Sequence, residues 1–233
     1  MQVYREHLLV GYGEVGQALH GVLAGRARVI VLTKNDEGEE SITPSDPVQR
    51  VEIMHICIPY SHNFFSSVKE YQKRFRPLST VIHSTVPVGI SRKLKAVHSP
   101  VRGIHPNLEN GIRTFVKFLG GSKAGNVADF FRSCGLRVML FDKAETTEAM
   151  KLFDTEYYRM CIEFVQRVKR YCDKNGLNFT DVYRIGNITY NEGYERLGYP
   201  EYRRPILEPI MGPIGGHCVE SNKELIKLSE NAI

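Results

Sequence analysis

A glycine-rich turn near the start of the chain has the spacing of a phosphate-binding loop. The apolar run Leu8–Val10 is followed by six residues with the pattern G-x-G-x-x-G, namely Gly11, Tyr12, Gly13, Glu14, Val15 and Gly16. In this pattern the first glycine permits a tight turn, the second lets the backbone approach a pyrophosphate, and the third lets a helix pack closely on a strand. The first turn of that helix offers N–H groups and a positive dipole to phosphates. We therefore expect a dinucleotide at residues 11–16, the alternative being a tight turn without a ligand.

The residues after the second apolar run bear on which dinucleotide binds. An acidic side chain at the end of the second strand would hold the ribose 2′-OH of NAD. Here Thr33 occupies that place and is followed by Lys34, while Asp36 lies slightly further on. Thr33 and Lys34 could hold the 2′-phosphate of NADP, whereas Asp36 could serve NAD if the turn is tight. A solvated polar turn is a third interpretation, so these residues leave NAD and NADP both open.

Cys218 is the sharpest candidate for a nucleophile. It ends a glycine-rich segment and precedes a helix expected at residues 221–229, whose start is indicated by the capping box of Ser221 and Glu224. The dipole of such a helix lowers the pKa of a nearby thiol, and the thiolate is the reactive form. Asn222 could assist Cys218 but is not a base. The alternative is a small buried side chain in a glycine loop.

Lys151, Thr155 and Thr85 carry polar groups that suit the transfer of a proton or a hydride. Lys151 and Thr155 are four residues apart in an expected helix and therefore share one face. Lys151 could stabilise a developing alkoxide or move a proton, and Thr155 could hydrogen-bond a substrate oxygen. Thr85 and Pro59 each follow an expected strand, at the edge where ligands bind in parallel sheets. A solvated lysine and turn-capping hydroxyls are the alternatives.

His105, Asn107 and His217 are weaker candidates for contacts with a substrate. His105 and Asn107 lie in the segment G-I-H-P-N, which we expect to face the substrate, and His217 lies beside Cys218. A single histidine is more often structural than catalytic, so a purely structural role stays open for His105.

The candidate site residues must be positioned by a fold. The sequence pattern of residues 1–142 predicts a fold with parallel strands. Short apolar runs alternate with helical patterns, which is the signature of βαβ units. Strands are expected at residues 7–10, 29–32, 53–58, 80–83, 115–119 and 138–141. Helices are expected at residues 14–24, 63–74, 91–96 and 126–134, with a loop at 43–47. We therefore predict an α/β fold in which residues 1–142 form a Rossmann domain that binds NAD(P).

Residues 143–233 predict a smaller, all-helical region for substrate binding and dimerisation. Apolar residues recur at helical spacing from residue 146 to residue 174, and Asn175-Gly176 is a natural stop. A helix of that length, roughly 43 Å, is too long for the remaining residues to cover. We therefore expect a homodimer through this helix, with burial against the chain's own sheet as the alternative. Residues 190–209 are expected to be irregular.

Composition argues against several other classes of protein. Hydrophobic residues make up 42% and charged residues 24%, as in ordinary globular proteins, and the net charge of +5 suits a small anionic ligand. We expect no nucleic acid, because lysine and arginine form no long run, and no membrane, because no apolar stretch approaches the ~20 residues of a spanning helix. The five cysteines are scattered, without the spacing of a metal site or a disulfide framework. With no recognisable signal peptide, these features predict a cytoplasmic protein without a metal.

Three strings resemble motifs of the UDP-glucose/GDP-mannose dehydrogenase family and occur in the family's order. Residues 84–89 (STVPVG) resemble the motif after the strand beside the nicotinamide. Residues 148–151 (EAMK) resemble the start of the central helix with its catalytic lysine, and residues 212–218 (GPIGGHC) resemble the loop with the catalytic cysteine. The resemblance favours NAD slightly over NADP. It also implies that Cys218 captures an aldehyde as a thiohemiacetal, which a second hydride loss converts to a thioester.

The chain departs from this family at several positions. The family's C-terminal domain, which grips the nucleotide of the sugar, has no counterpart here, and Thr155, Asn222 and Val101 replace an asparagine, an aspartate and a glutamate. The first hypothesis is therefore an NAD(P)-dependent oxidoreductase for a small polar alcohol, aldehyde or acid, which could be sugar-derived. The second is a non-catalytic dinucleotide-binding or regulatory protein derived from that family. A third is that a partner chain supplies the missing substrate domain.

Overall fold

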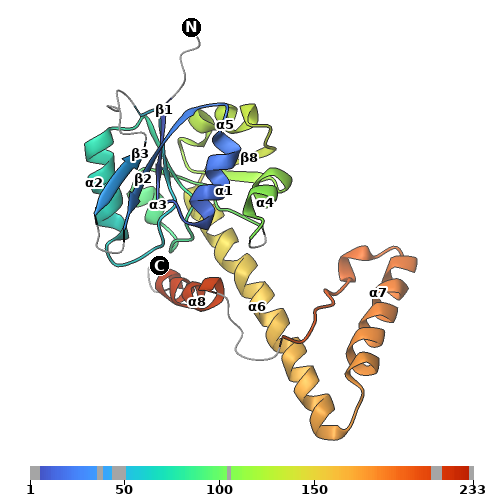
Figure 1. The fold of residues 1–233 in the computed structure, drawn as a ribbon. Coiled ribbons are helices and arrows are strands. Elements are labelled where there is room, and N and C mark those ends of the chain that lie inside the picture. The colour runs from blue at the N-terminus through green and yellow to red at the C-terminus, as the bar shows by residue number, and fades with distance from the viewer. Residues whose placement is uncertain (1–5, 36–38, 44–50, 104–105, 211–216, 231–233) are drawn as a thin grey trace. The chain divides into compact units, whose positions relative to one another are not determined.

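The computed structural model describes residues 6–35, 39–43, 51–103, 106–210 and 217–230. The chain divides into two compact units, which are residues 1–152 with 225–233, and residues 153–224. The first unit contains a β-sheet with helices around it, and the second consists of helices and their connections (Figure 1).

Among the described residues, eight strands form one sheet in the spatial order β3-β2-β1-β4-β5-β6-β7-β8. Their bounds are β1 (Glu6–Val10), β2 (Arg28–Lys34), β3 (Glu40–Thr43), β4 (Ile53–Ile56), β5 (Ser79–Ile82), β6 (Val97–His98), β7 (Lys117–Gly120) and β8 (Val138–Phe141). Neighbouring strands run parallel except in the pairs β2–β3 and β6–β7. The predicted α/β fold with a parallel sheet is therefore confirmed.

Helices cover both faces of this sheet. Leu9 of β1 belongs to a core cluster that also contains residues of α1, α4 and α5, whereas its neighbours Leu8 and Val10 belong to a second cluster with residues of α2. Adjacent strand residues point to opposite faces, so both faces need apolar side chains. The helices of this unit are α1 (Glu14–Leu23), α2 (Phe64–Phe75), α3 (Ile90–Lys93), α4 (Leu108–Thr114) and α5 (Ala124–Ser133).

The long helix α6 (Ala144–Asn175) continues from the first unit into the second. It ends where Gly176 adopts a φ of +65°, which confirms the predicted helix and its Asn-Gly stop. The rest of the second unit comprises a π-helical turn η1 (Thr180–Ile185), α7 (Gly186–Arg196), a 3₁₀ turn η2 (Pro200–Tyr202) and the first part of α8 (His217–Glu230). Among the helices of the described segments, none combines the length and hydrophobicity needed to cross a bilayer.

Several boundaries predicted from the sequence are wrong. Residues 190–196 belong to α7 rather than to an irregular segment, and the rings of Tyr190 and Tyr194 pack one helical turn apart with centroids at 4.7 Å. Helix α8 begins at His217, so Ser221 lies inside this helix and is not its N-cap. Thr43, expected in a loop, ends β3, while residues 44–47 lie outside the described residues. The short elements β3, α4 and β6 have too few residues to show a period, and the sequence analysis misses them.

Candidate dinucleotide-binding site

The turn between β1 and α1 meets the three geometric demands of its glycine pattern. Gly11 has a φ of +92°, and a Cβ there would lie 2.9 Å from Ile58 Cγ2. A Cβ on Gly16 would lie only 2.2 Å from the carbonyl oxygen of Gly11, so the helix could not approach the turn so closely. At Gly13, by contrast, a Cβ would meet nothing within 4 Å. The turn is thus tight at its two ends and open over its middle glycine, where a pyrophosphate would need the room.

The N-terminus of α1 faces this open space without a side-chain cap. Gly13 is the N-cap residue, and no side chain among the described residues bonds to the free end of the helix. Two hydrogen bonds fix the turn to β2 and α1. Gly11 N–H donates to Leu32 O at 2.9 Å, and Gln17 Nε2 donates to Tyr12 O at 3.0 Å. The Tyr12 hydroxyl lies 2.8 Å from His20 Nδ1, further along α1. An uncapped helix end in a rigid turn is suited to binding an anion.

The turn lies where the order of the strands changes direction. From β1 the chain first adds β2 on one side and later β4 on the other, so the carboxyl ends of β1 and β4 flank a switch point. Cys57, which follows β4, donates its N–H to Val10 O at 2.8 Å, and the exposed Pro59 follows two residues later. Ligands of open parallel sheets bind at such points, because the connections leave in opposite directions there.

The loop after β5 lies beside the loop after β4. Ser84 Oγ donates to Ile58 O at 2.5 Å, and His83 N–H donates to Ile56 O at 2.9 Å. Thr85 is the next residue and is half-buried. The structure therefore brings Thr85 and the segment containing Pro59 to the same edge of the sheet.

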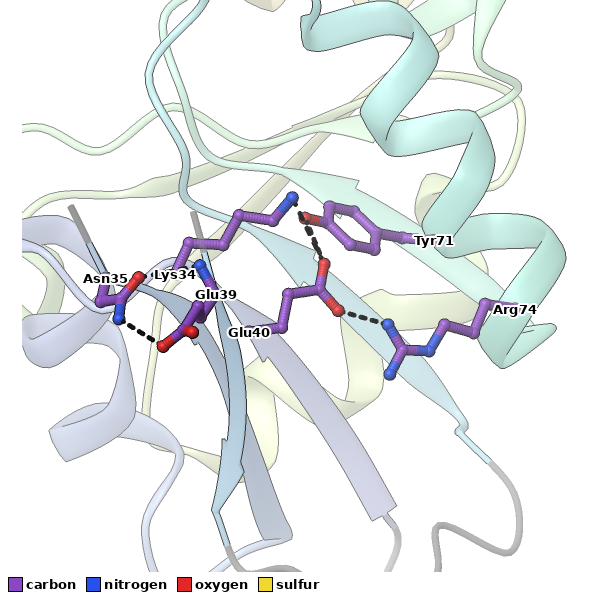
Figure 2. Close-up of polar contacts among 6 residues, drawn as sticks. All are labelled: Lys34, Asn35, Glu39, Glu40, Tyr71 and Arg74. Atoms are coloured by element: carbon purple, nitrogen blue, oxygen red, sulfur yellow. Dashed lines mark hydrogen bonds and ion pairs between the residues drawn. The ribbon is translucent and has the colours of Figure 1, made fainter. Parts of the chain in front are cut away.

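The end of β2 is a polar hairpin with β3. Thr33 Oγ1 lies 2.8 Å from Ser41 Oγ, and Lys34 Nζ lies 3.4 Å from Glu40 Oε1. Arg74 of α2 also pairs with Glu40, so two cations converge on one carboxylate (Figure 2). Burial raises the pKa of Glu40, but Arg74 and Lys34 outweigh it and hold the pKa below its usual value. Asp36, the residue that could serve NAD, lies outside the described residues.

The first turns of α6 are tied to the segment after β5 and to strand β6. The buried Glu148 carboxylate accepts N–H bonds from Gly89 at 2.6 Å and from Ser91 at 2.8 Å, and so caps α3. Burial is the main cause that raises the pKa of Glu148, although these hydrogen bonds oppose it. The Val88 N–H donates to Ser229 Oγ of α8 at 3.0 Å. The loop from residue 84 to residue 91 is therefore held at its far end by two helices.

Lys151 lies one turn beyond Glu148 on α6 and is half-buried. Its positive charge acts on His98 and on Lys117, and it contributes to lowering the pKa of both. His98 Nδ1 lies 2.9 Å from Thr147 Oγ1, and His98 Nε2 lies 3.3 Å from Ser84 O. Lys151 is thus placed near the strand ends that carry Thr85. Thr155 lies one further turn along the helix and is also half-buried.

The remaining predicted residues are placed only in part. Cys218 and His217 form the first turn of α8, so Cys218 lies within that helix and not before it, while their side chains are outside the described part of the structure. Asn222 is buried, at 5% exposure. Asn107 is the N-cap residue of α4, and His105 lies outside the described residues.

Lys117 and Glu148 are polar groups in the interior that are not predicted from the sequence. Lys117 of β7 is 3% exposed, and burial is the main cause that lowers its pKa to about 7. Burial likewise raises the pKa of Cys57 to about 12, with Lys117 opposing it, so this thiol is unreactive at neutral pH. One feature of the sequence does indicate that Lys117 is buried. It is a charged residue inside the apolar run from Val116 to Leu119, which belongs to a strand expected to be buried.

Solved structures similar to this one include several dehydrogenases. No family model matches the sequence, and no curated protein does. A UDP-D-ManNAc dehydrogenase from Pyrococcus horikoshii superposes with a TM-score of 0.74 at 18% identity, over 94% of this chain and 63% of its own. The UDP-N-acetyl-mannosamine dehydrogenase Cap5O from Staphylococcus aureus gives 0.66 at 17% identity, over 97% of this chain and 68% of its own. The 3-hydroxyisobutyrate dehydrogenase of Mycobacterium tuberculosis gives 0.67 at 13% identity, over 99% and 88%.

These likenesses define a class of fold, the Rossmann-type dehydrogenase fold with a long helix after the sheet. Within that class the chain resembles the nucleotide-sugar dehydrogenases and also a hydroxyacid dehydrogenase. It spans less than two thirds of the first of them, 63% of the Pyrococcus horikoshii enzyme. The resemblance to the UDP-glucose/GDP-mannose dehydrogenase family thus holds at the level of fold, over the part of those enzymes that this chain covers.

Proposed function

We propose that this chain binds NAD(H) or NADP(H) at residues 11–16 and acts as an oxidoreductase on a small polar alcohol, aldehyde or acid. The observation that carries the proposal is the glycine turn, which is tight at Gly11 and Gly16 and open at Gly13, at the switch point of a parallel sheet. Structural similarity to sugar-nucleotide and hydroxyacid dehydrogenases supports the class of reaction. Thr155, Asn222 and Val101, which replace polar or acidic residues of the nucleotide-sugar family, make a small substrate the simpler proposal.

The residues at the carboxyl edge of the sheet have distinct roles in this proposal. When bound, the nicotinamide ring supplies hydride acceptor or donor chemistry. The N-terminus of α1 binds the pyrophosphate, Pro59 and Thr85 line the nicotinamide side, and the hairpin at Thr33 and Lys34 receives the adenosine ribose. The ion pair of Lys34 with Glu40 leaves room for either dinucleotide, and we retain NAD as the first expectation.

Lys151 is the proposed group that moves a proton or stabilises an alkoxide. Its ammonium group supplies positive charge, which also contributes to lowering the pKa of Lys117 and His98, and positive charge favours an oxyanion over an alcohol. Thr155, one turn away, would hydrogen-bond a substrate oxygen. If Cys218 also takes part, its thiolate would add to the aldehyde carbonyl. A second molecule of oxidised dinucleotide would accept the hydride of the thiohemiacetal, and water would cleave the resulting thioester to the acid and the free thiol.

A homodimer through α6 is part of the same proposal. Large apolar side chains of this helix are exposed at positions that follow one another by three, four or seven residues, namely Phe153, Tyr157, Met160, Phe164 and Tyr171. The opposite side of the helix carries the buried Ile162, Val165 and Cys172. An exposed apolar stripe of this extent favours a protein partner, and a second copy of the chain is the simplest one.

The cofactor site can be tested with Gly13→Val. Gly13 has an ordinary φ of −72° and open space around it, so this side chain fits the fold but fills the position of the pyrophosphate. We expect NADH and NADPH binding, followed by nicotinamide fluorescence, to weaken at least about tenfold, or ~1.4 kcal/mol. Gly125→Ala, where a Cβ also meets nothing within 4 Å, is the matched control and should bind normally. Absence of binding by the unaltered chain would refute the proposal, and binding without turnover of any alcohol would favour the regulatory hypothesis.

A further inference from the structure

A row of histidines crosses the interior of the sheet. His7 of β1, His55 of β4 and His83, which follows β5, are all buried, at 0%, 0% and 3% exposure. His7 Nδ1 lies 3.1 Å from His55 Nε2, and His55 Nδ1 lies 3.0 Å from His83 Nε2. His55 therefore uses its two ring nitrogens for two different neighbours. The three imidazoles form a continuous chain of hydrogen bonds over three adjacent strands.

Lys117 joins this row at the His83 end. Lys117 Nζ lies 3.3 Å from His83 Nδ1, 3.0 Å from Ser99 O and 3.3 Å from Pro100 O. Ser99 O is also 3.0 Å from His83 Nδ1. Within the described residues no carboxylate pairs with Lys117. A buried amine that rests on carbonyls and an imidazole can hold a proton but is not locked to one by an opposite charge.

The surroundings of Lys117 connect it to the proposed cofactor site. The ionisable groups coupled to it are Cys57 after β4, Arg102 after β6 and Lys151 of α6, in addition to His55, His83 and His98. The ring of Phe131, on α5, lies 5.9 Å from Nζ. Cys57 itself lies beneath the glycine turn, since a Cβ on Gly16 would be 3.8 Å from Cys57 Cβ.

The distances in the row fit two arrangements of hydrogens, because each neutral imidazole donates from one nitrogen and accepts at the other. In the first arrangement each ring carries its hydrogen on Nδ1, so His7 donates to His55, His55 donates to His83, and His83 donates to Ser99 O. In the second arrangement Lys117 donates to His83 Nδ1, and the Nε2 hydrogens of His83 and His55 point toward the next ring. One arrangement converts into the other only if all three rings change together.

We propose that Lys117, His83, His55 and His7 form a proton relay through the sheet. Starting from the second arrangement, the Lys117 ammonium gives a proton to His83 Nδ1. His83 passes its Nε2 proton to His55 Nδ1, and His55 passes its Nε2 proton to His7 Nδ1. Three N–H bonds break and three form, no electron is transferred, and the positive charge moves from Lys117 to His7, which then carries hydrogens on both ring nitrogens. Loss of the His7 Nε2 hydrogen as a proton completes the change to the first arrangement.

The relay would serve the proposed reaction but does not depend on it. Oxidation of an alcohol releases one proton with each hydride. Lys117 lies close enough to the strand ends for Lys151 and Cys57 to change its pKa electrostatically. A pKa of about 7, caused mainly by burial, lets Lys117 gain or lose a proton near neutrality. Burial, together with positive neighbours, holds the pKa values of His55 and His83 well below the usual range. These rings are therefore neutral before and after they pass on a proton.

The relay can be tested by nitrogen NMR of the full chain labelled with ¹⁵N-histidine, since ring ¹⁵N shifts distinguish the two tautomers. Between pH 5.5 and 9 we expect His55 and His83 to stay neutral and to switch together from the Nε2–H to the Nδ1–H form, with one midpoint near the titration of Lys117. His98 is an internal control, because Ser84 O can only accept and so keeps the hydrogen of His98 on Nε2 at every pH. Separate midpoints, or one fixed tautomer for His55 and His83 over the whole range, would overturn the relay.

Lys117→Met supplies the matched variant, because methionine has a similar length and no proton to give. In this variant His83 should remain in the Nδ1–H form, bonded to Ser99 O, at every pH, and continued switching would contradict the proposal. If the variant does not fold, the tautomers of His55 and His83 measured over the pH series in the unaltered chain still test the relay. No cofactor is needed in this experiment, so NADH binding measured on the same sample keeps failure of the relay separate from failure of the proposed function.

Discussion

The sheet unit and the helical unit depart in opposite ways from the usual division into apolar interior and polar surface. The sheet unit buries ionisable side chains, among them Lys117, His55 and Glu148, each with hydrogen bonds inside the chain. The helical unit exposes large apolar side chains, among them Phe153 and Tyr157 at 59% and 60%. The first departure is satisfied within one molecule, which is typical of a site with chemistry to perform. The second is typical of an interface, and we propose that a second copy of the chain covers these side chains.

The largest expected effect follows from the buried lysine. Lys117 has its pKa lowered from an ordinary 10.5 to about 7, so between these values the unfolded chain binds more protons than the folded chain. The free energy of unfolding should therefore rise as the pH increases from about 7 to about 10, by up to roughly 4–5 kcal/mol. Urea unfolding of the sheet unit at a series of pH values measures this slope. Lys117→Met should flatten the dependence of the unfolding free energy on pH. An equal slope in both proteins would contradict the view that the buried lysine distinguishes the sheet unit.

Gly16→Ala should cost the sheet unit about 3 kcal/mol, because its Cβ would be forced against the carbonyl oxygen of Gly11. The denaturant midpoint measured by circular dichroism reports this loss. Gly13→Ala places the same atom in open space and should leave the midpoint nearly unchanged. If the two variants were equally stable, the turn would be looser than its geometry indicates.

Phe164→Glu should weaken the proposed homodimer about a hundredfold, or ~2.7 kcal/mol, since it places a charge within the apolar stripe of α6. Analytical ultracentrifugation over a concentration series measures the dissociation constant. Arg170→Glu also introduces a carboxylate at an exposed position of this helix, but outside the stripe, and should have little effect. A chain that is monomeric before any substitution would remove the contrast between the two units.

Glu40→Gln should have the smallest effect on stability, about 0.5–1 kcal/mol, because the ion pairs it removes are partly exposed. The same change frees Lys34 and Arg74 from their shared carboxylate. If the adenosine ribose lies at this hairpin, binding should shift several-fold toward NADPH relative to NADH. Titration with both cofactors checks the ratio, and an unchanged ratio would place the ribose elsewhere.

The parts of the fold that the sequence predicts are those in which several signals agree. The apolar run before Gly11, the glycine spacing and the helical pattern after it all indicate the β1–α1 turn. The helix α6 is predicted because its apolar period continues over eight turns, and Gly176 ends it. Such agreement is missing at α7, where glycines and tyrosines concealed a helix that local ring packing stabilises.

The polar interior could not be predicted, because it depends on residues far apart in the sequence. Glu148 caps α3 from 59 residues away, and the row at His7, His55 and Lys117 exists only once β1, β4 and β7 lie in one sheet. The apolar runs around His7, His55 and Lys117 indicate buried strands, but they do not indicate which polar groups these side chains meet there. At Cys218 a local signal gave the wrong boundary. The capping box of Ser221 and Glu224 predicts a helix that starts after Cys218, whereas α8 begins at His217.

The hydrogen bond between the Val88 N–H and Ser229 Oγ has a consequence for the synthesis of this protein. The two residues are 141 positions apart, so the loop that carries Thr85 gains this contact only after residue 229 has left the ribosome. A nascent chain stalled before residue 229 can form the glycine turn, since β1, α1 and β2 are complete within the first 34 residues. The glycine turn should therefore form earlier in translation than the contact that holds the far end of the loop after β5.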